Sequence, residues 1–355
     1  MEKEMVVGTR LKGSRDLKLD NVKGLLIILV VVGHFLLPMY RTRFITDCIY
    51  AIYVFHMPCF IMLSGYYAKS IYKNGKFRFI KLIDFIWLYF VFKMLVNITE
   101  GMLARHIPLF PDFLHESGAP WYLLALLFWY STIPLIHNIK RPVMKVLFVV
   151  FITIGISFGK YFVNCNDFLS MDRVLSFAPF FYLGYFCSEN LYKNAVKGKS
   201  AFLMALIGFV LLAIVFFTSY DLLFKYHLVV YGADYHRYDA SLNNYIWLIN
   251  IIWYVVAFLI SFAVIAAAPS ARLPFITKMG QNTLQIYILH RPIRDLCQYY
   301  NVYGYINPHE KIEVTGLMVF SALLAVLLGN NVFRKLFDMV KGLPTTFIMK
   351  MGISV

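Results

Sequence analysis

Long apolar runs recur along this 355-residue chain, and only short polar segments separate most of them. A bilayer core about 30 Å thick is crossed by about 20 helical residues, so each run is long enough to form a membrane-spanning helix. The first run follows a polar segment and has no small-residue cleavage site, so we expect a retained helix rather than a signal peptide. The pattern predicts about ten spans, at 20–39, 46–67, 80–97, 120–137, 144–162, 174–190, 200–219, 245–268, 280–297 and 313–333.

The composition agrees with this pattern. Apolar residues make up 60% of the chain and charged residues 15%, whereas a soluble domain has roughly 45–50% and about 25%. So much apolar surface needs lipid as its solvent, and we predict an all-α membrane protein. We expect one domain over residues 1–355, with a cytoplasmic N-terminal segment at 1–19 and a cytoplasmic tail at 334–355.

The formal net charge of +15 has two interpretations. In a soluble protein it would suggest a nucleic-acid partner. In a membrane protein the positive-inside bias gathers Lys and Arg in cytoplasmic loops. Basic residues here gather in alternate connections, among them 69–81 and 334–350. We therefore expect a cytoplasmic-membrane protein with both termini cytoplasmic, and no nucleic-acid partner.

Two features of the predicted outer face stay open. Three cysteines lie near this face: Cys48, Cys165 and Cys297. Either two of them form a disulfide or all are free thiols. No cysteine spacing in the chain resembles a metal site. The segment 220–245 is rich in Tyr, Asp, Asn and His. It is either an interfacial loop with aromatic anchors or a surface that stacks on sugar rings.

Ionisable side chains inside the predicted spans are the first sign of chemistry, because they are costly in lipid and mark functional sites by default. A single membrane histidine is often only a packing residue, but three lie at similar depth. His34 lies ~21 Å above the start of its helix, and His56 and His290 lie ~15 Å along theirs. The full set is Lys23, His34, His56, Asp84, Lys93, His290 and Arg291.

Lys23 and His34 share one face of the first helix. They are eleven residues apart, which is about three turns and roughly 16 Å. This spacing predicts a groove with a cation at its cytoplasmic mouth and an imidazole at its end, and Arg78 and Lys81 would add charge to the mouth. The other interpretation of Lys23 is a lysine that snorkels from a helix end.

Five sequence segments stand out along the chain. They are LDNVKGLLIILVVVGH (19–34) in the first span, FHMPCFIMLSGYY (55–67), PWYLLALLFW (120–129), PFFYLGY (179–185) and GQNTLQIYILHRP (280–292). In this order they resemble the acyltransferase-3 family of membrane proteins, nearest its fucose O-acetylase-like branch, and the first is similar to that family's basic-x10-His signature. Two positions depart from the family: Lys23 stands where Arg is usual, and Asp84 where Pro is frequent. Lysine keeps the attraction for phosphate but lacks the bidentate fork of arginine.

The resemblance implies transfer of an acyl group, usually acetyl from cytosolic acetyl-CoA, to a hydroxyl of a surface polysaccharide or lipid-linked glycan. Acetyl-CoA would be the cosubstrate, with no metal. His34 becomes the essential histidine, and His56 would orient it, stabilise an oxyanion or only pack. The candidates for donor binding are Lys23, Arg78, Lys81, Ser64, Gly65 and Tyr66, and those for acceptor binding are Trp121, Tyr122, His290, Arg291 and Arg294.

Several alternatives accompany this hypothesis. His34 could act as a general base or could carry the acyl group as a covalent relay. Arg291 and Asp295 are four residues apart and could simply pair within their helix. The acyl group could be succinyl. A glycan transporter or flippase, or a structural partner in a glycan-synthesis complex, are the rival functions.

Overall fold

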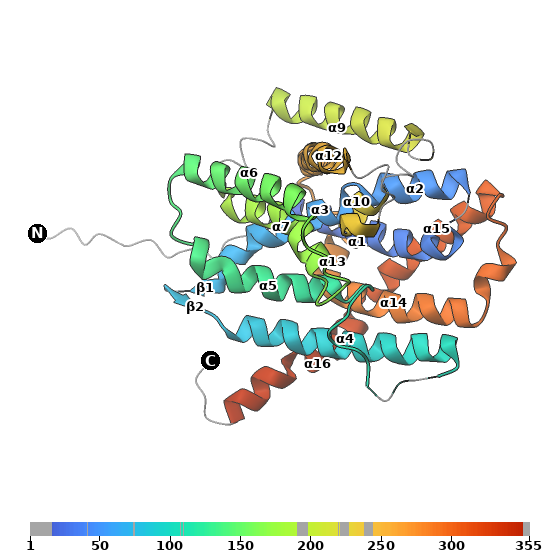
Figure 1. Cartoon of the computed structure of the whole chain (residues 1–355). Coiled ribbons are helices and arrows are strands. Elements are labelled where there is room, and N and C mark those ends of the chain that lie inside the picture. Colours follow the sequence, from blue (N-terminus) through green and yellow to red (C-terminus); the bar gives the residue numbers. More distant parts are fainter. Residues whose placement is uncertain are drawn as a thin grey trace, which may run out of the picture.

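Helices make up nearly all of the described structure, a computed structural model (Figure 1). It describes residues 16–40, 42–73, 75–106, 108, 110–189, 198–218, 220, 227–237 and 244–350. Most of the expected N-terminal segment, much of the 220–245 segment and the last five residues of the tail lie outside the described residues.

The described helices follow one another along the chain as α1 (Leu17–Leu36), α2 (Arg43–Tyr53), α3 (His56–Ala68), α4 (Ile80–Ala104), α5 (Trp121–Ile136), α6 (Pro142–Gly159), α7 (Met171–Phe186), α9 (Gly198–Thr218), α10 (His227–Tyr231), α12 (Ile246–Ala267), α13 (Pro274–Gln281), α14 (Thr283–Tyr299), α15 (Lys311–Leu328) and α16 (Asn331–Lys350). Short 3₁₀ turns are η1 (Leu37–Met39), η2 (Lys69–Ile71), η5 (Tyr235–Arg237) and η6 (Val302–Tyr305). Strands β1 (Tyr72–Lys73) and β2 (Lys76–Phe77) form one antiparallel hairpin.

The prediction of an all-α membrane protein is confirmed. Among the described residues, seven helical segments are long and apolar enough to cross a membrane. Helix α5 is apolar but shorter, and α7 and α14 lie where two further spans were predicted. The seven segments are Leu17–Met39, Arg43–Ile71, Ile80–Ala104, Pro142–Gly159, Gly198–Thr218, Ile246–Ala267 and Lys311–Leu328.

Two predicted spans are each broken into two helices. The second span breaks at Val54 and Phe55, between α2 and α3, so that His56 becomes the first residue of α3. The ninth predicted span, 280–297, has its break at Asn282, close to its start, so that α14 makes up nearly all of it and α13 precedes it. Apolar residues continue across the first break, which is why hydropathy gave no sign of it.

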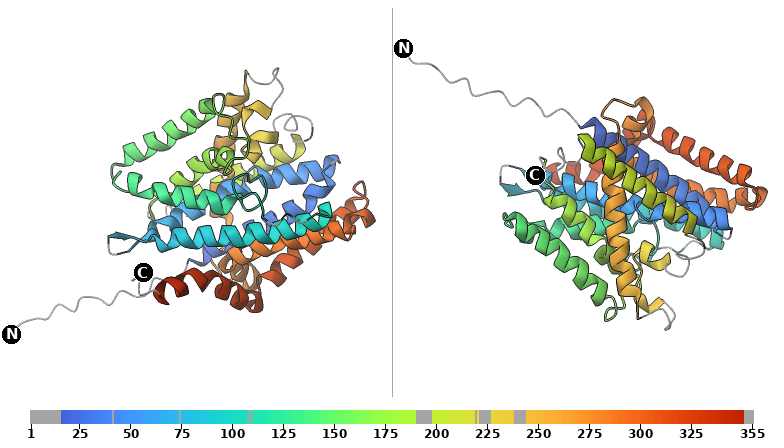
Figure 2. Two further views of the ribbon diagram at one scale, coloured as in Figure 1. Left: turned by 60° about the horizontal axis from the view of Figure 1, so that its bottom comes forward. Right: turned by 90° about the horizontal axis from the view of Figure 1, so that it is seen from above.

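Glycines allow the closest helix contact around α1. A Cβ on Gly24 would lie 2.0 Å from the carbonyl oxygen of Ile276, and one on Gly280 would lie 1.7 Å from that of Asp20. Helices α1 and α13 therefore meet backbone to backbone, which fixes the start of α1 against the start of α14. Helix α12 points along the view in Figure 1 while α4, α5 and α14 lie across it, so α12 crosses them steeply (Figures 1 and 2).

The C-terminal segment was predicted only as a tail, but residues 331–350 form α16. Its exposed apolar residues recur every three or four positions on one face, as in helices that lie at a membrane surface. These residues are Val332, Leu336, Met339, Val340, Leu343 and Phe347. All five cysteines, each in the described part of the chain, are free thiols.

Candidate active site

Two cavities meet end to end inside the bundle. We call the end of the bundle that carries β1 and β2 the hairpin end and the opposite end the loop end. The hairpin-end cavity, of about 190 Å³, includes Lys23 in its lining, and the histidine cavity, of about 220 Å³, includes His34. Both are lined by Val30, Met57 and Tyr287. These three residues form the junction, the place where the two cavities adjoin.

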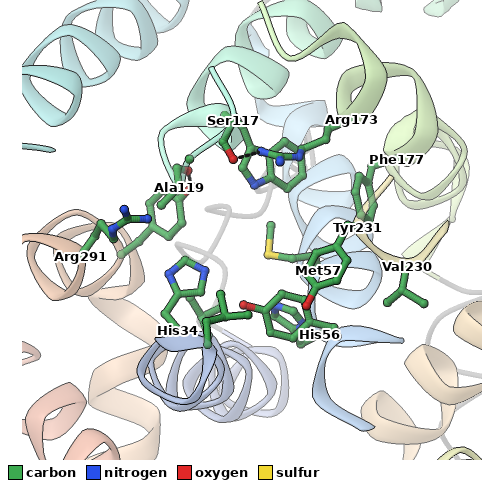
Figure 3. Close-up of a pocket in the computed structure, with 16 residues that line it drawn as sticks. His34, His56, Met57, Ser117, Ala119, Arg173, Phe177, Val230, Tyr231 and Arg291 are labelled. Carbon is green, nitrogen blue, oxygen red and sulfur yellow. Dashed lines mark hydrogen bonds between the residues drawn. The ribbon is translucent and has the colours of Figure 1, made fainter. Parts of the chain in front are cut away.

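The histidine cavity contains two imidazoles in its wall and a third directly behind. His34 comes from α1 and His56 from the start of α3 (Figure 3). His290 of α14 is fully buried, and its Nε2 lies 2.9 Å from Nδ1 of His34. His56 was one candidate to orient His34, whereas the ring bonded to His34 is that of His290. His56 instead bonds through Nδ1 to the carbonyl oxygen of Ile52, at 2.8 Å.

The partners of these rings fix which nitrogen of His34 is available. A carbonyl oxygen only accepts hydrogen bonds, so Nδ1 of His290 donates to the carbonyl of Ile286, 3.1 Å away. In a neutral ring the other nitrogen is then an acceptor, so Nε2 of His290 accepts from Nδ1–H of His34. Nε2 of His34 is left with a lone pair. That is the tautomer a general base requires.

Two arginines line the histidine cavity from the loop end. Arg173, one residue before the predicted sixth span, donates to the carbonyl of Ser117 at 2.7 Å and lies 5.9 Å from the ring of Trp121. Arg291 bonds Asp295 at 3.0 Å, which is the intrahelical pair considered from the sequence. Figure 3 shows the labelled Arg173 and Arg291 around the same open centre as His34.

In the hairpin-end cavity, Lys23 pairs with the fully buried Asp20 at 2.8 Å and lies 4.9 Å from the ring of Tyr67. Ser64 and Tyr122 line the same cavity and share a hydrogen bond of 2.6 Å. The remaining lining is mainly aliphatic and aromatic, so this is an apolar tube with one cation and a few hydroxyl groups.

Some predicted donor residues lie elsewhere. Lys81 donates to Ser70 at 2.9 Å, and neither Lys81 nor Arg78 is among the described lining residues. Tyr67 takes the place in the cavity that was assigned to Tyr66. Gly65 faces α7, where a Cβ would lie 1.9 Å from the carbonyl oxygen of Phe181.

The predicted acceptor residues divide between the cavities. Trp121 and Arg291 line the histidine cavity, while Tyr122 lines the hairpin-end cavity. Arg294 also bonds Asp295 and is absent from the described linings of both.

Sequence reasoning missed several lining residues. Tyr287 precedes His290 by three positions, so helical spacing could have placed the two on one side of α14. Asp20, which pairs with the lining residue Lys23, likewise precedes it by three. Arg173 and Tyr231 gave no local signal, because tertiary packing brings them to the cavity.

Residues 16–330 match the model of the acyltransferase-3 family, described as an acyltransferase domain. The chain belongs to this family. The family prediction made from the five motifs is thereby confirmed, and the described part of the chain carries this domain on the apolar helices of a membrane protein.

Two curated proteins match a short part of the chain. Both are named nodulation protein NolL. The protein from Sinorhizobium fredii (strain NBRC 101917 / NGR234) is 49% identical over 61 residues, which are 16% of this chain and 17% of that protein. The protein from Mesorhizobium japonicum (strain LMG 29417 / CECT 9101 / MAFF 303099) is 41% identical over 63 residues, 16% of each. The match thus spans about one sixth of these relatives' length. No solved structure matches the chain.

Proposed function

We propose that this acyltransferase moves an acyl group, in the first place acetyl, from cytosolic acyl-CoA to a hydroxyl of a surface polysaccharide or lipid-linked glycan. The observation that carries the proposal is the junction at Val30, Met57 and Tyr287, with Lys23 on one side and His34 on the other. A donor and an acceptor that enter from opposite ends would meet there without either crossing the membrane.

The hairpin end is assigned to the cytosol and the donor. Its connection between α3 and α4 is rich in Lys and Arg, as the positive-inside bias favours. Lys23 would attract the CoA phosphates as a point charge, although Asp20 already offsets part of its charge. The pantetheine arm would follow the tube toward Met57, past the hydroxyl pair of Ser64 and Tyr122.

In the reaction, Nε2 of His34 takes the proton of the acceptor hydroxyl as the oxygen attacks the thioester carbonyl carbon. The tetrahedral intermediate collapses with cleavage of the C–S bond, and His34 returns the proton to the departing thiolate. The products are the O-acyl ester and free CoA. Arg173 and Arg291, both in the cavity wall, would stabilise the oxyanion.

A covalent relay uses the same nitrogen. Nε2 of His34 would attack the thioester carbonyl carbon, and the C–S bond would break to release the CoA thiolate. The acceptor hydroxyl would then attack the acyl-imidazolium, which restores neutral His34, and the hydroxyl proton would pass to the thiolate. Acid quench during turnover, followed by mass spectrometry of the peptide that contains His34, separates the two routes. An acyl adduct would exclude the simple base.

The transporter or flippase hypothesis loses support, because the family match covers both cavities. A structural partner would keep the family fold and lose the chemistry, and the intact Lys23, His34, His56 and His290 argue against it. Binding of acetyl-CoA tests the proposed acyltransferase function. Acetyl-CoA is expected to raise the melting temperature of the detergent-solubilised protein. If acetyl-CoA gave neither a thermal shift nor hydrolysis, the assignment of the donor would be wrong.

The decisive variant is His34→Ala, with the exposed His309→Ala as its matched control. Loss of the base should lower transfer of labelled acetyl into membrane glycan by about 10²–10⁴-fold. The thermal shift with acetyl-CoA should persist, because His34 is outside the lining of the hairpin-end cavity. Undiminished turnover in His34→Ala would refute the mechanism.

A further inference from the structure

A third cavity, which we call the polar cavity, adjoins the histidine cavity at the loop end. It has a volume of about 340 Å³ and lies between α4, the segment 110–118 and α14. Ser117, Gly118 and Arg291 line both this cavity and the histidine cavity. Its size is within the usual range of about 300–1,000 Å³ for ligand sites. A ligand in the polar cavity would therefore extend directly toward His34.

The charges in this cavity are unevenly exposed. Its lining includes two cations, Lys93 and Arg291, and three carboxylates, Glu100, Asp112 and Glu116. Lys93 pairs with Glu116 at 2.7 Å, and Arg291 pairs with Glu100. The cationic side chains are only 15% and 13% exposed, whereas Glu100 is 51% and Asp112 62% exposed. The accessible charge is thus negative.

Asp112 is the second exposed carboxylate at the rim of the polar cavity. In the described ion pairs it has no Lys or Arg partner. Its partner is His115, whose Nδ1 lies 2.8 Å from a carboxylate oxygen. This hydrogen bond holds the pKa of the Asp112 carboxyl below its usual range, so the group is ionised at neutral pH. Its other oxygen accepts from the backbone N–H groups of Leu114 and His115.

We propose that the polar cavity binds one uncharged or positively charged sugar ring of the acceptor, next to the ring whose hydroxyl enters the histidine cavity. Carboxylate oxygens accept hydrogen bonds from sugar hydroxyl or ammonium groups, and an exposed acidic rim repels carboxylate or phosphate groups. The acceptor is therefore a neutral glycan or an amino sugar, and anionic polymers are excluded. This inference rests on the proposed function, since it takes a glycan as acceptor.

The test compares three tetrasaccharides of equal length, made of glucosamine, N-acetylglucosamine or galacturonate. Their binding to the detergent-solubilised full chain is measured by calorimetry at low ionic strength. The first two should bind more tightly than galacturonate. Asp112→Asn should weaken glucosamine binding about fivefold and strengthen galacturonate binding about fivefold, as expected for one charge at ~4 Å in water, so the ratio of the two dissociation constants should narrow by about 25-fold. Salt should narrow it further by screening. Asparagine keeps a side-chain oxygen that can accept the hydrogen bonds from the backbone N–H groups of Leu114 and His115.

The matched control is Glu310→Gln, which removes an exposed carboxylate before α15 from outside the polar cavity. It should leave the preference unchanged. The inference would be overturned if galacturonate bound as tightly as the other two sugars, or if none of the three bound. It would also be overturned if Glu310→Gln narrowed the difference between glucosamine and galacturonate as much as Asp112→Asn does. Hydrolysis of acetyl-CoA without any sugar reports separately on the proposed function, because the donor enters at the opposite end.

Discussion

Replacing His290 with phenylalanine removes the nitrogen that accepts from His34 while it keeps a planar ring in the same buried place. Nδ1–H of His34 then loses its partner, and the tautomer with a proton on Nε2 is no longer disfavoured. A buried donor without a partner costs about 1–3 kcal/mol. If the whole of this cost raises the free energy of the transition state, kcat falls about 5- to 150-fold, since each 1.36 kcal/mol changes a rate tenfold.

The assay is transfer of labelled acetyl in membranes, with kcat and the KM for acetyl-CoA determined separately. We expect kcat to fall and KM to stay, because His290 is absent from the described lining of the hairpin-end cavity. His290→Gln, whose side-chain oxygen also accepts hydrogen bonds, should recover part of the loss. If His290→Phe kept kcat, or if His290→Gln were no better than His290→Phe, the positioning role would be refuted.

Three further predictions concern donor access and packing. Lys23→Arg should keep the KM for acetyl-CoA while Lys23→Glu raises it, and an equal rise in both would exclude a phosphate contact. Met57→Phe narrows the junction of the two cavities, so kcat should fall; part of the thermal shift with acetyl-CoA should remain, because the proposed phosphate contact at Lys23 is kept. Unchanged kcat would show that the acyl group takes another path. Gly65→Ala should destabilise the protein by about 1–3 kcal/mol, because the added Cβ would lie 1.9 Å from the Phe181 carbonyl oxygen. In the control Gly155→Ala the added Cβ has nothing within 4 Å. Equal melting temperatures of the two variants would refute the packing argument.

Local periodicity predicted the features that lie along one helix. Lys23 and His34 are three turns apart on α1, and the structure places them in two cavities that meet at Val30. Hydropathy also located the apolar helices, because each must satisfy its backbone hydrogen bonds internally in lipid. The amphipathic α16 escaped this test because its charged residues lower the mean hydropathy.

Contacts between distant segments were beyond such reasoning. His34 and His290 are 256 residues apart, and their hydrogen bond depends on the close contact that Gly24 and Gly280 allow between α1 and α13. His56 and His290 lie at similar depths in their predicted spans. Depth therefore could not decide which of the two rings orients His34. The pair Lys93–Glu116 joins a helix to a loop and gave no periodic signal at all.

The described lining of the histidine cavity suits a base at bilayer depth because none of its residues is acidic. A carboxylate would hold a charge there in the resting state, at a high cost in lipid. The bonded pair of His34 and His290 carries no charge until the acceptor proton is taken. Arg173 and Arg291 disfavour the imidazolium but favour the oxyanion that forms in the same step. Because the proton returns to the thiolate inside the cavity, the proposed cycle moves an acyl group toward the loop end without moving net charge across the membrane.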